Sequence, residues 1–273
     1  GDANNVVITI TGFNKFSTVP KGITGNVTVA GISNTQLLEF DPVDIRNNMA
    51  EATDGAKDFS FTIPCLDKIV EIVPDSTFET QKALDTLRGC TKIKGDLIIQ
   101  NFTTPTIDFS VFNCLKEITG RIEIVGNTTL TAISGFAKLT KIGASISPYL
   151  EFFGITTPFS IIIFNNPELK TIAGFGALET VGSNFYIFIN PILASIPEFT
   201  ALETVGGDFS IFSNAKLESI TGFGVLEIVG GFFQISNNAA LTSIPKFTEL
   251  ETVDASFIIN SNAELASIAG FGV

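Results

Sequence analysis

Residues 207–230 read GDFSIFSNAKLESITGFGVLEIVG, and this pattern recurs through the second half of the chain at a step of 24 residues. Apolar positions alternate strictly only over Phe209-Ser-Ile211, and from Asn214 onward they recur at every third residue. Neither an α-helix nor one long strand sustains that spacing, whereas short strands joined by corners do. A fixed period of this length is typical of solenoids. We therefore predict a mainly β fold, a right-handed parallel β-solenoid with 24-residue coils.

An asparagine follows the alternating segment of each coil and forms a column of its own. Leucine-rich repeats place an inward asparagine at this point, where the side-chain amide bonds neighbouring backbone at a corner. We interpret the column as structural rather than ligand-binding. Its members are Asn127, Asn166, Asn190, Asn214, Asn238 and Asn262.

The register is interrupted once. Leu139 and Leu178 occupy the same column but lie 39 residues apart, one coil of 24 plus an insertion of 15. The insertion falls near 145–159 and carries Tyr149, Phe152 and Phe153. Loops on a rigid scaffold often carry recognition, but three bulky apolar side chains can equally fold back onto the solenoid. Both interpretations of these candidate binding residues stay open.

The front of the chain has a different character. A helix is predicted over 75–89, where Ser76 and Glu79 fit a capping box and Gly89 ends the helix, with Leu84 and Leu87 facing inward to cap the solenoid. Strands are predicted at 6–10 and 26–32, and a short helix over 41–52. We therefore expect a β-rich cap or assembly segment over 1–60, followed by the solenoid over 61–273.

Two stretches near this helix resemble the receptor L domain, a fold of the ectodomains of insulin and epidermal growth factor receptors with similar repeats in fungal GPI-anchored cell-wall proteins. They read LRGCTKIKGDLII at 87–99 and CLKEITGRIEI at 114–124. The resemblance covers roughly 60–273 and concerns fold more than function. In that family a disulfide commonly joins the start of the domain to the end of the capping helix. This implies a Cys65–Cys90 bond and a free Cys114, with Cys90–Cys114 as the rival pairing.

Composition argues against catalysis and several classes of partner. The chain has no histidine, a net charge of −12, and no arginine after Arg121. Most acid–base and phosphate chemistry therefore lacks its usual residues, and nucleic acid or anionic membranes are poor partners. No apolar stretch approaches the ~18 residues of a membrane helix. We expect a protein that is not an enzyme and holds no cofactor or metal.

Two outward columns are further candidates. Glu179, Glu203, Glu227 and Glu251 stack at coil spacing, where like charges repel by ~1 kcal/mol per neighbour in water. A basic partner or Ca²⁺ would relieve that repulsion, and solvated side chains would tolerate it. A serine column, beside a threonine column that Ile228 interrupts, raises ice binding as a remote alternative.

The function expected first is that of an extracellular structural or adhesive surface protein. The sequence begins at Gly1 in the manner of a mature secreted chain, and its last coil stops before a polar cap. An open end favours head-to-tail self-association into filaments or arrays. The alternative is a receptor-type ectodomain that binds a protein or glycan.

Overall fold

The computed structural model describes residues 5–8, 59–62, 65, 68–73, 76–104, 106–147, 156–196 and 199–271. The chain divides into two compact units, Gly1–Pro64 and Cys65–Val273. In the first unit, β1 (Asn5–Ile8) pairs antiparallel with β2 (Phe59–Thr62). The strand predicted at 6–10 therefore overlaps β1, whereas the strand predicted at 26–32 and the helix predicted over 41–52 lie outside the described residues.

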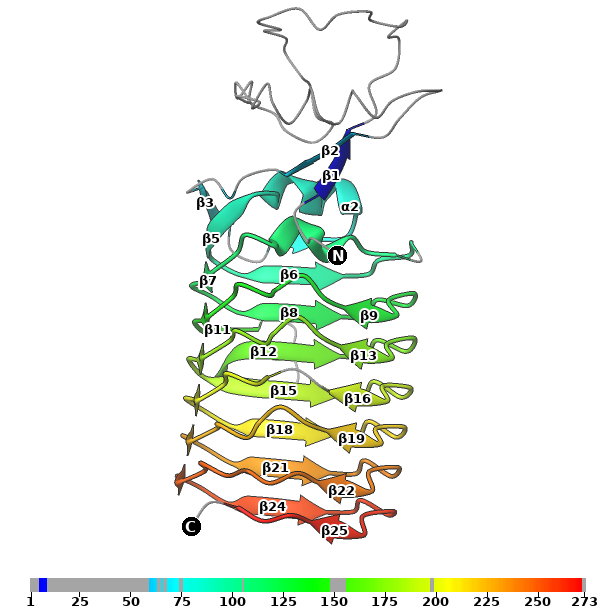
Figure 1. Cartoon of the computed structure of the whole chain (residues 1–273), viewed down its shortest axis with the longest axis vertical. Helices are drawn as coiled ribbons and strands as arrows, with labels where there is room; N and C mark the ends of the chain where they lie inside the picture. The colour runs from blue at the N-terminus through cyan, green and yellow to red at the C-terminus, as the bar shows by residue number, and fades with distance from the viewer. Residues whose placement is uncertain are drawn as a thin grey trace, which may run out of the picture. The chain divides into compact units, whose positions relative to one another are not determined.

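The second unit is a parallel β-solenoid, as predicted (Figure 1). Each regular coil contributes one short strand to each of three sheets, which we call the first, second and third sheets in the order in which the chain visits them. Phe209 pairs with Phe185 in one direction and with Phe233 in the other, so the pairing register equals the sequence repeat. The local alternation at Phe209-Ser-Ile211 forms the longer strand of the coil, in the second sheet.

The strands of the described residues are assigned to the sheets as follows. The first sheet contains β3 (Lys68–Glu71), β5 (Cys90–Lys94), β7 (Glu117–Ile118), β10 (Lys141–Ile142), β14 (Thr180–Val181), β17 (Thr204–Val205), β20 (Ile228–Val229) and β23 (Thr252–Val253). The second contains β4 (Thr77–Phe78), β6 (Leu97–Gln100), β8 (Ile122–Val125), β12 (Pro158–Phe164), β15 (Asn184–Phe188), β18 (Phe209–Phe212), β21 (Phe233–Ser236) and β24 (Phe257–Asn260), with β11 (Ser145–Ile146) pairing to β12. The third contains β9 (Ala132–Ile133), β13 (Thr171–Ile172), β16 (Ser195–Ile196), β19 (Ser219–Ile220), β22 (Ser243–Ile244) and β25 (Ser267–Ile268).

The core is built from stacked phenylalanine rings. Phe209 stacks on Phe185 of the preceding coil with ring centroids 5.2 Å apart, and Phe223 stacks on Phe199 at 5.0 Å. The two columns meet edge to face, since Phe209 and Phe223 lie 5.0 Å apart at 81°. Both arrangements are the favourable ones for aromatic pairs. The repeat therefore produces a continuous core in which each coil buries its apolar side chains against its neighbours.

The asparagine column lies inside the solenoid and bonds backbone at the corner after each second-sheet strand. Asn166 is fully buried, and its Nδ2 donates to the backbone oxygens of Ile124 and Phe164 at 3.0 and 3.1 Å. Its Oδ1 accepts from the backbone N–H of Asn127 at 3.1 Å. Among the described residues, no buried side-chain polar atom lacks a hydrogen-bond partner. The column therefore forms a buried ladder of hydrogen bonds that joins the corners of successive coils.

The predicted helix over 75–89 is wrong in its start and its cap. The helical segment is α2 (Gln81–Leu84), continued by the 3-10 turn η1 (Asp85–Leu87). Thr80 is the N-cap in place of Ser76, because Thr77 and Phe78 are drawn into β4. Leu84 and Leu87 are buried in the core, and Gly89 follows with a φ of 78°, as a helix stop requires. A second 3-10 turn, η2, spans Phe109–Phe112.

Both predicted disulfide pairings are wrong, because Cys65 bonds Cys114, with their Cα atoms 5.2 Å apart. Cys90 is free and fully buried among the apolar side chains of the core. As the first residue of β5 it faces the core, whereas Cys65 is partly exposed. Burial is the main cause that raises the pKa of the Cys90 thiol to about 11, so the thiol stays protonated at neutral pH.

Candidate binding surfaces

A second apolar cluster lies outside the core, on the outer face of the second sheet. We call it the outer aromatic cluster. Phe188 stacks on Phe164 with ring centroids 4.7 Å apart, and Phe212 continues the stack at 4.8 Å. The cluster comprises Val125, Phe159, Ile162, Phe164, Tyr186, Phe188 and Phe212. Phe159 and Ile162 are fully buried, whereas Tyr186, Phe188 and Phe212 are partly exposed, so the cluster opens to solvent toward β18.

Strand alternation explains how this cluster forms. In β18, Phe209 and Ile211 point into the core, so Ser210 and Phe212 point outward. The column that ends at Phe212 becomes Ser236 in the next coil, which limits the aromatic surface to the middle of the stack. This site was not among the sequence predictions, although phenylalanine recurs one residue after the inward isoleucine and would have revealed it.

Tyr186 gives the outer aromatic cluster a polar edge. Its hydroxyl donates to Asp208 Oδ2 at 2.8 Å, across one coil step. Burial, followed by the hydrogen bond and negative charge of Asp208, raises the Tyr186 pKa well above its ordinary value. Asp208 Oδ1 also accepts from the backbone N–H of Phe232 at 2.8 Å. Asp208 therefore ties three neighbouring coils together and holds the tyrosine ring in place.

A buried ionic network lies beside the cluster, where the insertion leaves the solenoid. Arg121 is 1 % exposed and forms ion pairs with Asp96 and with Glu123, the latter at 2.8 Å and 3 % exposed. Its Nη1 also donates to the Ile146 carbonyl oxygen at 2.8 Å. Ser147 Oγ donates to Glu123 Oε2 at 3.1 Å. These contacts fix the start of the insertion on the outer face of the second sheet.

The described residues at both ends of the predicted insertion pack on the second sheet. β11 pairs antiparallel with the start of β12, joining Ser145 to Phe159 and Ile146 to Pro158. The three aromatic residues proposed for recognition, Tyr149, Phe152 and Phe153, lie outside the described residues.

The glutamate column is exposed along the outer face of the first sheet. The backbone N–H of Glu203 donates to the carbonyl oxygen of Glu179 at 3.0 Å, and the series continues through Glu227 to Glu251 at 2.9 Å per step. All four side chains are exposed and form no ion pair with another described residue. Within the described ranges, no group of three or more His, Cys, Asp or Glu side chains is arranged to hold a metal ion.

The serine column takes the outer positions of the third sheet, which carries none of the clusters described above. Ser195, Ser219 and Ser243 start β16, β19 and β22 and pair in register. Each of these strands has only two residues, so the column is narrow.

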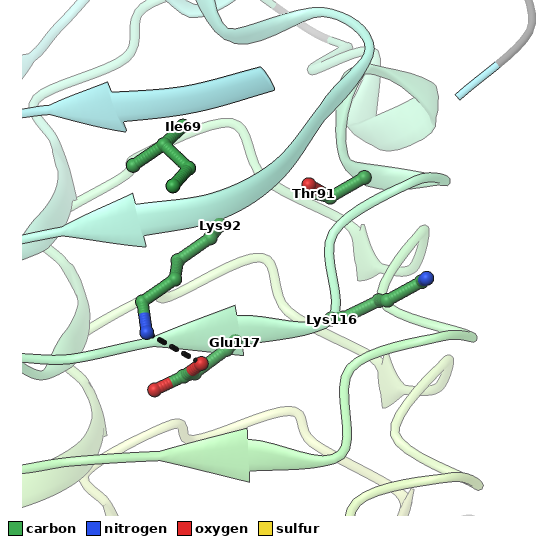
Figure 2. Close-up of a pocket in the computed structure, with 5 residues that line it drawn as sticks. All are labelled: Ile69, Thr91, Lys92, Lys116 and Glu117. Carbon is green, nitrogen blue, oxygen red and sulfur yellow. Dashed lines mark hydrogen bonds and ion pairs between the residues drawn. The ribbon is translucent and has the colours of Figure 1, made fainter. Parts of the chain in front are cut away.

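A shallow hollow lies at the front of the first sheet, over β3, β5 and β7 (Figure 2). Lys92 Nζ pairs with Glu117 Oε2 at 2.7 Å within it, on neighbouring strands. Ile69, Thr91 and Lys116 complete its lining, and the Ile69 side chain is 57 % exposed. The hollow therefore combines an ion pair with one exposed apolar side chain.

Comparison with family models finds a similarity over part of this solenoid. Residues 89–200 match the model of the receptor L domain, which confirms the resemblance seen in the sequence. The receptor L domain is a non-enzymatic binding family, and together with the disulfide it indicates an extracellular region. No curated protein matches the chain. No helix in the described part of the chain has the length and apolarity needed to cross a bilayer.

Proposed function

With coils that match the receptor L domain, we propose that this chain is the ligand-binding part of a receptor-type ectodomain and that the ligand binds the outer aromatic cluster. The partial exposure of Tyr186, Phe188 and Phe212, outside the core and on a rigid sheet, carries the proposal. Apolar rings left open to water on a folded scaffold are characteristic of interaction sites.

Ring geometry favours a protein ligand over a glycan. Phe188 is stacked between Phe164 and Phe212, within 10° of parallel to each, so both faces of its ring are covered and its edge is what remains for a ligand. A sugar ring packs on an open aromatic face, whereas aliphatic and aromatic side chains pack well against ring edges. We therefore propose a protein segment with apolar side chains as the ligand.

Charge favours a basic ligand. The described residues from 156 onward carry ten acidic side chains against Lys170, Lys216 and Lys246, a balance of −7. A field of one sign over the surface accelerates the approach of a partner of opposite sign. Lysine or arginine beside the apolar anchors of the ligand would meet Asp208 at the edge of the cluster.

The proposal includes the absence of catalysis and of a cofactor. The whole chain lacks histidine, and the hollow on the first sheet is lined by an ion pair, one isoleucine and two further side chains. These observations support a binding role and supply no candidate for a reaction centre.

The test uses random peptides displayed on phage and selected on the purified chain. Binding of the enriched peptides is then measured for Phe188→Ser/Phe212→Ser and for Val225→Ser, which removes an exposed apolar side chain from a turn elsewhere. We expect at least about a tenfold loss for the first variant, equivalent to ~1.4 kcal/mol, and none for the second. Circular dichroism and thermal unfolding check that both variants are folded.

Two outcomes would overturn the proposal: peptides that bind both variants equally, or selections that enrich no binder. A glycan array probed in parallel distinguishes the ligand class, because glycan binding that disappears in Phe188→Ser/Phe212→Ser would replace the protein ligand with a glycan. Head-to-tail self-association into filaments, and a structural or adhesive role, stay predictions from the sequence.

A further inference from the structure

Charges of opposite sign are separated along the outer face of the first sheet. Backbone hydrogen bonds place Lys116, Thr140, Glu179, Glu203 and Glu227 in one column. Each of the last four donates its N–H to the carbonyl oxygen of the residue before it at 2.9–3.0 Å. The neighbouring column begins with Lys92 and Glu117 and continues with Lys141, before the threonines of β14 and β17. The face is therefore basic over β5 to β10 and acidic over β14 to β23.

Most of these charges have no ion-pair partner among the described residues. Lys116 and Lys141 are exposed, and in the described residues neither forms a salt bridge. The same holds for the four glutamates, whereas Lys92 pairs with Glu117. A face with unpaired cations at one end and unpaired anions at the other is complementary to itself after a half turn.

A twofold axis between β10 and β14 brings the opposite charges together. It sets β10 on β14, β7 on β17 and β5 on β20 of a second copy, because the strands on either side of the axis have the same spacing. Lys116 then faces Glu203 of the same column, whereas Lys141 lies opposite Thr180 and next to Glu179. Lys92 lies opposite Ile228 and next to Glu227. Such an interface is isologous, since each contact occurs twice, and it closes at two copies.

An apolar contact falls in the same register. The outer position of β20 is Ile228, which is 40 % exposed and interrupts a column of threonines at Thr204 and Thr252. With β20 laid on β5 of the second copy, Ile228 lies over the hollow of Figure 2, beside the exposed side chain of Ile69. The hollow and the isoleucine are therefore at matching distances from the axis.

We propose that two copies of this chain associate side by side and antiparallel through the outer faces of their first sheets. Lys116 and Lys141 of each copy pair with Glu203 and Glu179 of the other, and Ile228 enters the hollow beside Ile69. This inference is independent of the ligand site on the second sheet, and it differs from end-to-end growth because assembly stops at the dimer.

The experiment measures association by sedimentation velocity over a wide concentration range. Three double variants are compared with the unmodified chain: Glu179→Lys/Glu203→Lys, Lys116→Glu/Lys141→Glu, and the control Glu218→Lys/Glu264→Lys. The control changes the net charge as the first variant does, but at exposed positions away from the first sheet. We expect the unmodified chain and the control to dimerise. For each of the first two variants the dissociation constant of the dimer should rise at least about tenfold, which corresponds to ~1.4 kcal/mol.

The decisive sample is an equimolar mixture of the first two variants. Every proposed contact in the mixed dimer joins a lysine to a glutamate again, so dimerisation should return to the level of the unmodified chain. Ile228→Thr, which installs the residue of the neighbouring coils, should weaken the dimer while leaving thermal unfolding unchanged. A tag on one variant allows the mixed species to be identified directly.

Three results would overturn the proposal. The unmodified chain could remain monomeric at every concentration, or the mixture could fail to recover association. Association that requires Ca²⁺ and is lost only in Glu179→Lys/Glu203→Lys would assign the glutamates to a cation instead. Loss of peptide binding in Phe188→Ser/Phe212→Ser leaves these measurements unaffected, so the two proposals fail separately.

Discussion

Asn190 and Asn214 are joined by two hydrogen bonds inside the solenoid. Asn214 Oδ1 accepts from the backbone N–H of Asn190 at 3.1 Å and from Asn190 Nδ2 at 3.3 Å. Asn214 Nδ2 donates in turn to the carbonyl oxygens of Ile187 and Phe212 at 3.0 and 3.1 Å. Each asparagine thus completes the corner of its own coil and bonds the coil before it.

Asn214→Ala should lower the free energy of unfolding by about 2–4 kcal/mol. The change leaves several buried backbone groups without partners, and each such group costs about 1–3 kcal/mol. Chemical denaturation measures the effect, and Asn260→Ala, at an exposed position of β24, is the control. Equal stability of the two variants would contradict a structural role for the column.

Gly230→Ala should destabilise the solenoid by about 1–3 kcal/mol through overpacking. A Cβ at Gly230 would lie 2.5 Å from the backbone oxygen of Gly206 in the preceding coil, and backbone cannot move aside as a flexible side chain can. Gly224→Ala meets nothing within 4 Å and should be neutral or stabilising by up to about 1 kcal/mol. The pair is compared by thermal unfolding, where similar values for both would show that coils do not approach so closely.

Ile189→Asn should stabilise the chain by about 1 kcal/mol. Ile189 has a φ of 52°, a left-handed conformation that costs a β-branched residue about 1–2 kcal/mol and that asparagine tolerates. The equivalent residue two coils later is Asn237, with a φ of 55°. The reverse change, Asn237→Ile, should destabilise by a similar amount, and denaturant midpoints of the two variants shifting in the same direction would refute the explanation.

Arg121→Leu should cost about 3–5 kcal/mol, because it leaves the buried carboxylate of Glu123 without its cation. Arg121→Leu/Glu123→Leu removes that carboxylate too and should recover part of the loss. A double-mutant cycle measured by chemical denaturation gives the coupling between the two residues. A double variant no more stable than Arg121→Leu would show that the ion pair with Glu123 is not the main contribution of Arg121 to stability.

The native chain should not react with a thiol reagent near neutral pH, and the denatured chain should react at Cys90 alone. Cys90 is buried, and Cys65 and Cys114 are bonded to each other. Digestion under non-reducing conditions, followed by mass spectrometry, should yield a peptide pair joined through Cys65 and Cys114. A pair joined through Cys90 would contradict the structure.

The same thiol predicts a loss of stability at high pH. Its pKa is raised from 9.0 to about 11 in the folded chain, so the unfolded chain releases the proton first. The stabilisation is present below pH 9.0 and is lost as the pH rises through the folded value, by up to about 1.4 kcal/mol per pH unit. Cys90→Ala should reduce this slope when unfolding is measured across that range.

The repeated columns were readable from sequence because the information is local and redundant. Phe209 and Ile211 reveal a strand by their alternation, and Asn214 marks its corner in every coil. The outer column of Phe164, Phe188 and Phe212 could have been found by applying the same alternation to the outward positions. Tyr186 could not be linked to Asp208 in this way, because that contact depends on which residues of neighbouring coils come level.

The front of the solenoid was harder to predict, since it does not repeat. Ser76 and Glu79 form a convincing local cap for a helix, but pairing of Thr77 and Phe78 with β6 outweighs that local preference. The disulfide was hard to predict for the same reason, since it also depends on residues that are distant in the sequence. Cys65 and Cys114 are 49 residues apart in the chain and meet only after the coils have stacked.

The sequence by itself determined the coil length, the inward columns and the parallel stacking, because a 24-residue period of apolar side chains can be buried in one way only, coil upon coil. Tertiary structure alone decided the cysteine pairing, the burial of Arg121 between two acids, and the separation of lysines from glutamates on one face. Each of these depends on the distance between residues remote in the chain, which no local pattern encodes.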